Sequence, residues 1–139
     1  MTHYTDLSPY SYLPETVQPG VHALNVGWLA PFHRHPKGAV PPAFTEALAL
    51  LCRDDRRAVT RGFHPCGLWH RPGAAPGKPV RTAVGGVPVT LGTAEVRVAA
   101  PDGTLLIAPT LVLHYVTAHR YRPPDAFIDA VMAGRRATG

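Results

Sequence analysis

The chain has 139 residues, a formal net charge of +5 at pH 7 and 45% hydrophobic residues. This length suffices for one domain with its own core. No apolar run approaches the roughly 18 residues that a membrane span requires, and the polar N-terminus does not follow the signal-peptide pattern. We therefore expect one cytoplasmic domain over residues 1–139, without a membrane partner. The 16 prolines and 13 glycines predict irregular segments between short regular elements.

The first third of the chain predicts an arm and one strand. Residues 1–20 hold three prolines among three tyrosines, which predicts an extended arm packed by its tyrosines. Residues 21–29 alternate in polarity, which predicts a strand with Leu24, Val26 and Trp28 on its core face. The proline-rich loop that follows carries two histidines at its surface.

A helix is predicted over residues 42–53, because paired prolines suit the first helical turn and apolar residues recur along one face. Cys52 belongs to that apolar face, so we expect a small buried residue and not a metal ligand. We expect both cysteines to be reduced. Residues 71–79 contain three prolines and two glycines and predict a surface loop.

The second half of the chain predicts strands followed by helices. A turn at Asp102-Gly103 predicts a hairpin over residues 93–107. The remaining elements are expected as strands over residues 80–84 and 87–91, a helix from Pro109 to His119, and a helix from about Pro123 to Gly134. This order indicates an α+β fold, with a small, mainly antiparallel sheet and helices packed against it.

Two imidazoles and one thiol lie within seven residues, at His64, Cys66 and His70. A turning backbone can point such side chains at one centre, and thiolate and imidazole ligands suit zinc. Three ligands do not complete a tetrahedron. Whether a fourth protein ligand or water closes the site decides between a structural and a catalytic metal.

The expected fourth ligand is a histidine of the helix that begins near Pro109. On a regular helix His114 and His119 diverge by about 140°, so both should not reach one metal. His114 lies inside the helix and is preferred, whereas His119 lies near its end. The predicted metal ligands are therefore His64, Cys66, His70 and His114, with His119 or water as alternatives in the fourth position.

Other polar residues offer weaker signals. Glu95 and Arg97 share one face of a predicted strand, which predicts an exposed pair. Asn25 is expected either to contact a ligand or to form buried hydrogen bonds to a loop. The positive charge favours anionic partners. No nucleic-acid-binding signature accompanies that charge, so nucleic acid is an unfavoured partner and the partner is an unknown protein or small molecule.

Several blocks of the chain resemble a family of small, uncharacterised bacterial proteins without an established activity. The blocks that carry the resemblance are Asn25-Val26-Gly27-Trp28-Leu29, Arg61-Gly62-Phe63-His64-Pro65-Cys66 and His114-Tyr115-Val116-x-x-His119-x-Tyr121-x-Pro123-Pro124. The resemblance implies one domain and no particular function. Relatives often carry a second cysteine three residues after the first. Here Trp69 occupies that position, and the resemblance implies that His70 replaces the thiol.

The sequence supports three functional hypotheses. In the first, zinc is structural in a small binding or regulatory protein, because one thiolate and three imidazoles saturate the ion. In the second, an open position supports hydrolase or lyase chemistry, with Glu95, Tyr115 or His119 as a proton carrier. In the third, the protein binds a partner without metal, and Cys66 is a loop thiol.

Overall fold

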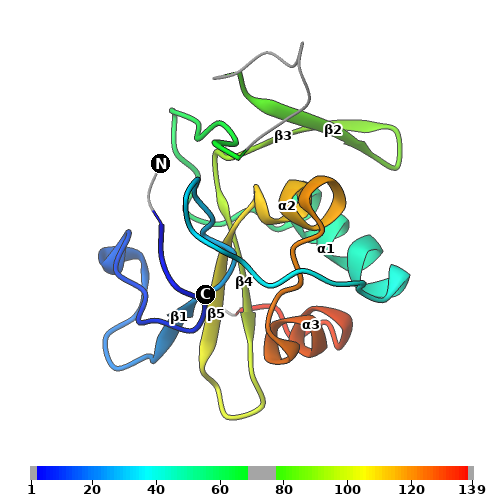
Figure 1. Ribbon diagram of the computed structural model, residues 1–139. Coiled ribbons are helices and arrows are strands. Elements are labelled where there is room, and N and C mark those ends of the chain that lie inside the picture. The colour runs from blue at the N-terminus through cyan, green and yellow to red at the C-terminus, as the bar shows by residue number, and fades with distance from the viewer. Residues whose placement is uncertain (1–2, 69–77, 138–139) are drawn as a thin grey trace.

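The computed structural model describes residues 3–68 and 78–137. Within these residues the chain forms a three-stranded sheet of order β1-β5-β4, a separate two-stranded hairpin and three α-helices (Figure 1). The elements in chain order are η1 (Pro14–Thr16), β1 (Ala23–Asn25), α1 (Pro42–Asp54), β2 (Val80–Val84), β3 (Val87–Leu91), β4 (Glu95–Ala99), β5 (Leu105–Pro109), α2 (Val112–His119) and α3 (Asp125–Met132). The expected α+β class is confirmed.

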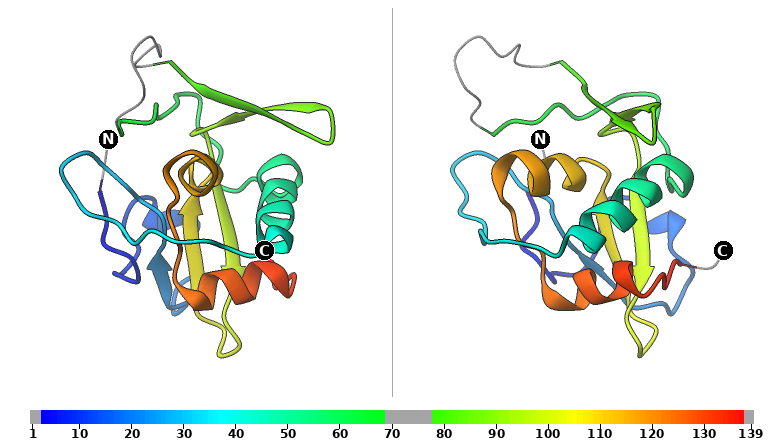
Figure 2. Two further views of the ribbon diagram at one scale, coloured as in Figure 1. Left: turned by 45° about the vertical axis from the view of Figure 1, so that its right-hand side comes forward. Right: turned by 90° about the vertical axis from the view of Figure 1, so that its right-hand side faces the viewer.

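The three helices lie together against β4 and β5, and the β2–β3 hairpin extends beyond α2 (Figures 1 and 2). The apolar face of α1 supplies Phe44, Leu48, Leu51 and Cys52 to the core, as its periodicity predicts. Cys52 is fully buried, and both cysteines are free thiols. Burial raises the pKa of the Cys52 thiol to about 12. Among the described residues, no helix is long and apolar enough to span a bilayer.

The strand expected over residues 21–29 is shorter than its alternation suggests. Regular pairing with β5 ends at Asn25, and Gly27 adopts a φ of +74° that leaves the extended region. The core face continues past this break, because Val26 and Trp28 are buried and the Trp28 indole donates to the carbonyl of Ile107. Alternation therefore identified Val26 and Trp28 correctly, but Leu24 is only partly buried and Asn25, expected on the opposite face, is fully buried.

The prediction that Pro109 opens a helix is wrong. Pro109 is the last residue of β5 and pairs with Glu95, and α2 begins at Val112. The amide of Thr110 still donates to the carbonyl of Ala94, so the antiparallel pairing runs through the proline. Proline is compatible with this position because it ends the strand and its missing N–H is not needed there. The predicted hairpin and the end of α3 before Gly134, with a φ of +71°, agree with the structure.

The N-terminal arm packs its tyrosines around Trp28. The rings of Tyr4 and Tyr12 lie 5.4 and 5.3 Å from the Trp28 ring, centroid to centroid. Isolated bridges join Tyr4 to Trp28 and Pro9 to Leu24. The arm therefore adds bonding to the β1 segment. Most of the surface loop expected over residues 71–79 lies outside the described residues.

Asp6 ties this arm to the segment after α2. Its carboxylate accepts from the amide of Gly27 at 2.9 Å and from the Tyr121 hydroxyl at 2.8 and 2.9 Å. Tyr121 is fully buried, and that burial together with Asp6 raises the pKa of its hydroxyl far above the usual value. The hydroxyl therefore stays protonated and donates to Asp6.

Candidate metal centre

Cys66, His114 and His119 bring three potential ligand atoms together. The Cys66 Sγ lies 3.4 Å from the His119 Nε2, which in turn lies 3.2 Å from the His114 Nε2. All three ligand atoms lie within 4.8 Å of one another. Among the described residues, these three side chains form a group that can hold a metal ion.

The two histidines meet because the last turn of α2 is wider than a regular α-helical turn. The amide of Arg120 donates to the carbonyl of Tyr115, five residues back, and the amide of Tyr121 reaches the same carbonyl at 3.1 Å. A regular α-helix spaces these bonds by four residues, whereas a π-type turn spaces them by five. Five residues then make about one turn, which brings residues 114 and 119 to one face.

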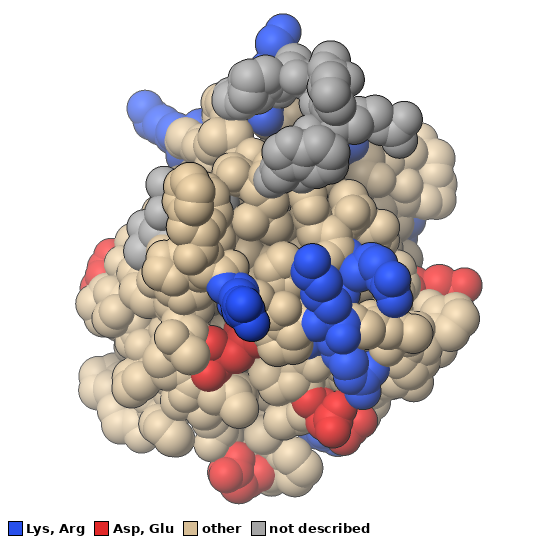
Figure 3. Space-filling model, viewed as in Figure 1, with Lys and Arg blue, Asp and Glu red and all other residues tan. Residues whose placement is uncertain are grey.

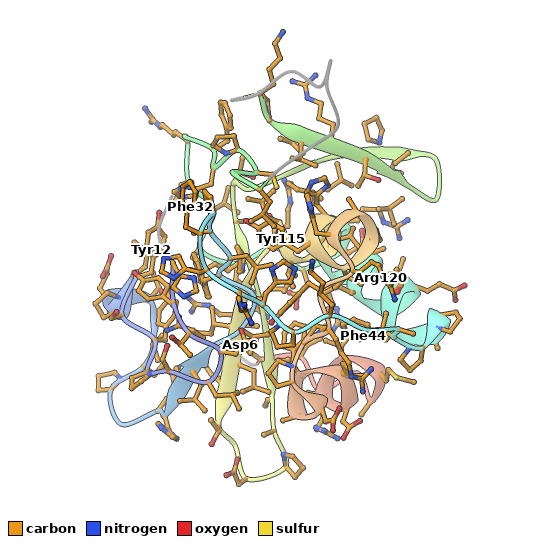
Figure 4. All side chains as sticks on the ribbon, in the orientation of Figure 1. Asp6, Tyr12, Phe32, Phe44, Tyr115 and Arg120 are labelled. Carbon is orange, nitrogen blue, oxygen red and sulfur yellow. The ribbon has the colours of Figure 1, made fainter. Side chains whose placement is uncertain are left out.

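The expectation that His114 and His119 point apart is therefore wrong. It rested on a regular helix, whereas α2 ends at His119 and Arg120 follows in the left-handed region with a φ of +55°. Figure 4 shows Arg120 at the end of α2 and Tyr115 in the preceding turn. No proline, glycine or asparagine marks this helix end in the sequence, so the widened turn had no local signal.

Backbone pairing fixes the loop that carries Cys66. The amide of His64 donates to the carbonyl of Gly92 at 2.9 Å, and the amide of Thr60 donates to the carbonyl of Thr93 at 2.7 Å. A Cβ at Gly92 would overlap the His64 carbonyl oxygen, so glycine allows the loop to approach. Cys66 and Leu68 then pack against the core. The thiol is thereby placed over the end of α2.

Of the other two ligands predicted from the sequence, one lies elsewhere and one is outside the described residues. His64 is not in the converging group, and its Nε2 lies 2.9 Å from the Tyr12 hydroxyl, with which it shares a hydrogen bond. His70 lies outside the described residues. The structure therefore joins Cys66 and His114 from the predicted set and brings His119 to them.

The thiol environment favours the neutral form when no metal is bound. Burial raises the pKa of Cys66 above its usual value, and a hydrogen bond from the Leu68 backbone offsets part of this shift. Burial and the nearby Cys66 also raise the pKa of Tyr115. A cation at this point would stabilise the thiolate, because metal binding displaces the thiol proton.

Glu95 and Arg97 do not form the exposed pair that their alternation predicts. Their relative exposures are 2% and 7%, and Arg97 Nη2 lies 2.7 Å from Glu95 Oε1. The N-terminal arm covers them: the Tyr10 hydroxyl donates to Glu95 at 2.7 Å, and Arg97 donates to the carbonyl of Thr16 at 2.9 Å. Alternation could not reveal this second covering layer, because the arm is distant in sequence.

Burial raises the pKa of Glu95 above its usual value, although hydrogen bonds from Tyr10 and Arg97 pull it down. Of the candidate proton carriers, Glu95 is thus committed to a buried ion pair, and His119 belongs to the converging group.

Asn25 forms buried hydrogen bonds to a loop, which is one of the two roles expected for it from the sequence. It is fully buried, and its side-chain amide donates to the carbonyls of Ser8 and Pro9 at 3.2 and 2.9 Å.

Basic side chains gather beyond the end of α2 (Figure 3). Lys37 pairs with Tyr121 across an antiparallel bridge, and the amide of Arg122 donates to the carbonyl of Pro36. These contacts place Lys37 beside Arg120 and Arg122. Arg122 also pairs with Asp125 at 2.9 Å, which neutralises part of this cluster.

These features define an α+β domain that carries a Cys/His₂ group able to hold a metal ion. The chain belongs to the family described as a domain of unknown function, DUF7919, whose model matches residues 2–132. No curated protein and no solved structure matches the chain. The expected membership of an uncharacterised family is thereby confirmed over most of the sequence.

Proposed function

We propose that the protein binds a transition-metal ion, with zinc as the best fit, through Cys66, His114 and His119. The ion has a structural role: it joins helix α2 to the loop that carries Cys66, which is hydrogen-bonded to Gly92 through the His64 amide. In this role the protein is a small binding or regulatory protein. We also propose a reducing compartment such as the cytoplasm, because Cys66 must remain a thiol to serve as a ligand.

The spacing of the three ligand atoms carries the proposal. Tetrahedral zinc, with typical bond lengths to nitrogen and sulfur, separates two nitrogens by about 3.3 Å and a sulfur from a nitrogen by about 3.6 Å. The corresponding separations are 3.2 Å between the two imidazoles and 3.4 Å between Cys66 and His119. These two separations are therefore close to those of ligands around one zinc ion, and the third pair, Cys66 and His114, lies within 4.8 Å.

Hydrogen bonding among the three side chains is a poorer account of this arrangement. The His119 Nε2 faces both Cys66 and His114, and a neutral imidazole nitrogen offers either one N–H or one lone pair. Pairwise hydrogen bonds would have to share that atom. A cation accepts the lone pairs of all three donors together, and thiolate with imidazole is a donor set that zinc prefers.

A structural role is favoured over catalysis by the state of the candidate proton carriers. Glu95 is buried in its ion pair with Arg97, and burial raises the pKa of Tyr115 still further above neutral pH, so neither residue offers a free base. The three ligands come from segments about fifty residues apart in sequence, so one ion crosslinks the fold. Hydrolase or lyase chemistry at an open position is the competing hypothesis, and the response of the fold to metal removal separates the two.

Zinc content measured by elemental analysis tests the proposal. We expect one zinc per chain in the wild type and a loss of affinity in the variants Cys66→Ala, His114→Ala and His119→Ala. The matched control is His22→Ala, because His22 is exposed and outside the converging group. A wild type without stoichiometric zinc, after equilibrium dialysis against buffered zinc, would refute metal binding.

Two further variants define the remaining position. His70→Ala tests a predicted ligand that lies outside the described residues. His64→Ala tests a predicted ligand whose side chain is hydrogen-bonded to Tyr12. Zinc loss from His70→Ala would make the centre a closed four-ligand site. Unchanged zinc in both variants would leave that position to water and would favour the catalytic hypothesis.

A further inference from the structure

A pocket of about 490 Å³ lies between α1, α2 and the β2–β3 hairpin. Its walls come from Ala49 and Leu50 of α1, Val84 of β2, and Leu113 and His114 of α2. This volume falls within the range of about 300–1,000 Å³ that is typical of small-molecule sites. The pocket thus lies where three separate elements meet, and one of its walls belongs to the candidate metal centre.

The lining combines an apolar surface with hydroxyl groups. Leu91 and Leu113 line the pocket and are buried, whereas Leu50, which also lines it, is 47% exposed. Thr45, Thr82 and Thr117 add hydroxyl groups from all three walls. A mainly apolar lining with a few polar groups is the usual composition of a site that buries a small organic molecule.

The charges of the pocket select the class of ligand. Among the described lining residues, Glu46 on α1 and Arg81 on β2 are the charged ones, and their formal charges cancel. Both side chains belong to exposed residues. A ligand with a net charge would have one attractive and one repulsive partner, so the electrostatics favour an uncharged ligand.

We propose that this pocket binds a small, uncharged, mainly apolar molecule that lies against His114. The threonine hydroxyls bond its polar atoms, and the leucines bury its body. This inference goes beyond the metal site, since the pocket exists apart from the ion. It also rests on the proposed function in one respect: the contact with His114 brings the ligand beside the metal centre.

Titration of the 139-residue protein with prodan tests the pocket. Prodan is an uncharged naphthalene with one ketone, and its fluorescence changes when it leaves water. We expect saturable binding of one equivalent. Anilinonaphthalene sulfonate, of similar size but anionic, should bind at least about tenfold more weakly, because Glu46 offsets the attraction of Arg81 and burial of the sulfonate among apolar side chains costs desolvation energy. Unsaturable prodan fluorescence, or tighter binding of the sulfonate at this site, would overturn the proposal.

Cavity-filling variants locate the binding. Ala49→Trp fills the pocket from α1 and should weaken prodan binding about tenfold or more. Ala43→Trp is the matched control, because Ala43 lies on the same helix but is exposed and outside the lining. Thr82→Trp fills the pocket from β2 and replaces Ala49→Trp if that variant does not melt cooperatively. Equal prodan affinity in the wild type and a folded filling variant would refute the location.

Cobalt reports on the contact with His114. When Co²⁺ replaces zinc, its visible absorption depends on the ligand geometry. Saturating prodan should shift that absorption in the wild type, and an unchanged spectrum would overturn the contact with His114. Failure of cobalt to bind at all would refute the metal proposal alone, because the prodan titration decides the pocket independently.

Discussion

The backbone of Gly27 packs directly against the side chain of Val112, the first residue of α2. A Cβ at position 27 would lie 2.8 Å from Val112 Cγ2, and Gly27 has a φ of +74°. Val112 is fully buried, so it has little room to move. This contact sets the depth at which α2 enters the core, and α2 carries both histidines of the candidate metal centre.

Gly27→Ala should therefore destabilise the fold by about 2–4 kcal/mol, through overpacking and backbone strain together. Gly20→Ala is the matched control, since Gly20 has a φ of +83° but a Cβ added there would meet nothing within 4 Å. Its cost should be strain alone, about 1 kcal/mol. Urea denaturation measures both changes. Equal decreases in the free energy of unfolding of the two variants would show that the contact with Val112 does not contribute to stability.

Zinc removal should lower the melting temperature. At free zinc about a thousand times the dissociation constant, binding adds about 4 kcal/mol to the free energy of unfolding. Each kcal/mol corresponds to about 2–8 °C in a domain of this size, so a chelator should lower the midpoint by about 10 °C or more. Differential scanning calorimetry with and without the chelator checks this. The midpoint of Cys66→Ala should not respond to the chelator.

The two thiols should differ in reactivity. Cys52 is fully buried and its pKa is about 12, so it should resist alkylation by iodoacetamide in the folded protein. Cys66 is only partly buried and should react in the zinc-free protein. Zinc should protect Cys66, because the ligand lone pair is then engaged. Peptide mass spectrometry after timed alkylation distinguishes the two, and rapid modification of Cys52 would contradict the buried position.

Replacing Arg97 should lower the free energy of unfolding, because Glu95 then stays buried without its ion-pair partner. Arg97→Met leaves that carboxylate buried without its guanidinium, which should cost about 3–5 kcal/mol at pH 7. Glu95→Gln in the same chain should restore much of the loss. Arg56→Met is the control, because Arg56 is exposed. Urea denaturation compares the four proteins, and a double variant as unstable as Arg97→Met would show that the buried charge is not the cause.

The pKa of Glu95 also predicts a dependence on pH. Burial raises this pKa in the folded state, so the folded chain holds the proton more tightly than the unfolded chain. The contribution of Glu95 to the free energy of unfolding is therefore complete below the unfolded pKa of about 4.3 and falls as the pH rises through the folded pKa. Arg97→Met should then lose less stability at pH 5 than at pH 7. An equal loss at both values would contradict the sign.

The sequence predicted those elements whose signals are local. Helix α1 follows from two prolines and an apolar face, and the β4–β5 hairpin follows from the turn at Asp102-Gly103. It did not predict where Glu95 lies, since the layer that buries Glu95 comes from Tyr10, 85 residues away. Burial by a distant segment leaves no periodic trace in the strand itself.

The candidate metal centre was predicted only in part, because one of its features has no local signal in the sequence. Cys66 and His114 were identified from ligand chemistry and from their places in a loop and a helix. His119 was set aside because a regular helix of 3.6 residues per turn would point it away from His114. The widened turn depends on the carbonyl of Tyr115 accepting from two amides, and neither residue type nor spacing signals such bonding.

The bond between Asp6 and Tyr121 bears on how the chain folds during synthesis. It closes a loop of 115 residues, and the β1–β5 pair is parallel and joins residues about eighty apart. Contacts so distant in sequence form late and slowly. The arm therefore cannot complete its native contacts until α2 and the segment after it have been synthesised. Until then, the first 28 residues have only their local contacts, such as those of Tyr4 and Tyr12 with Trp28.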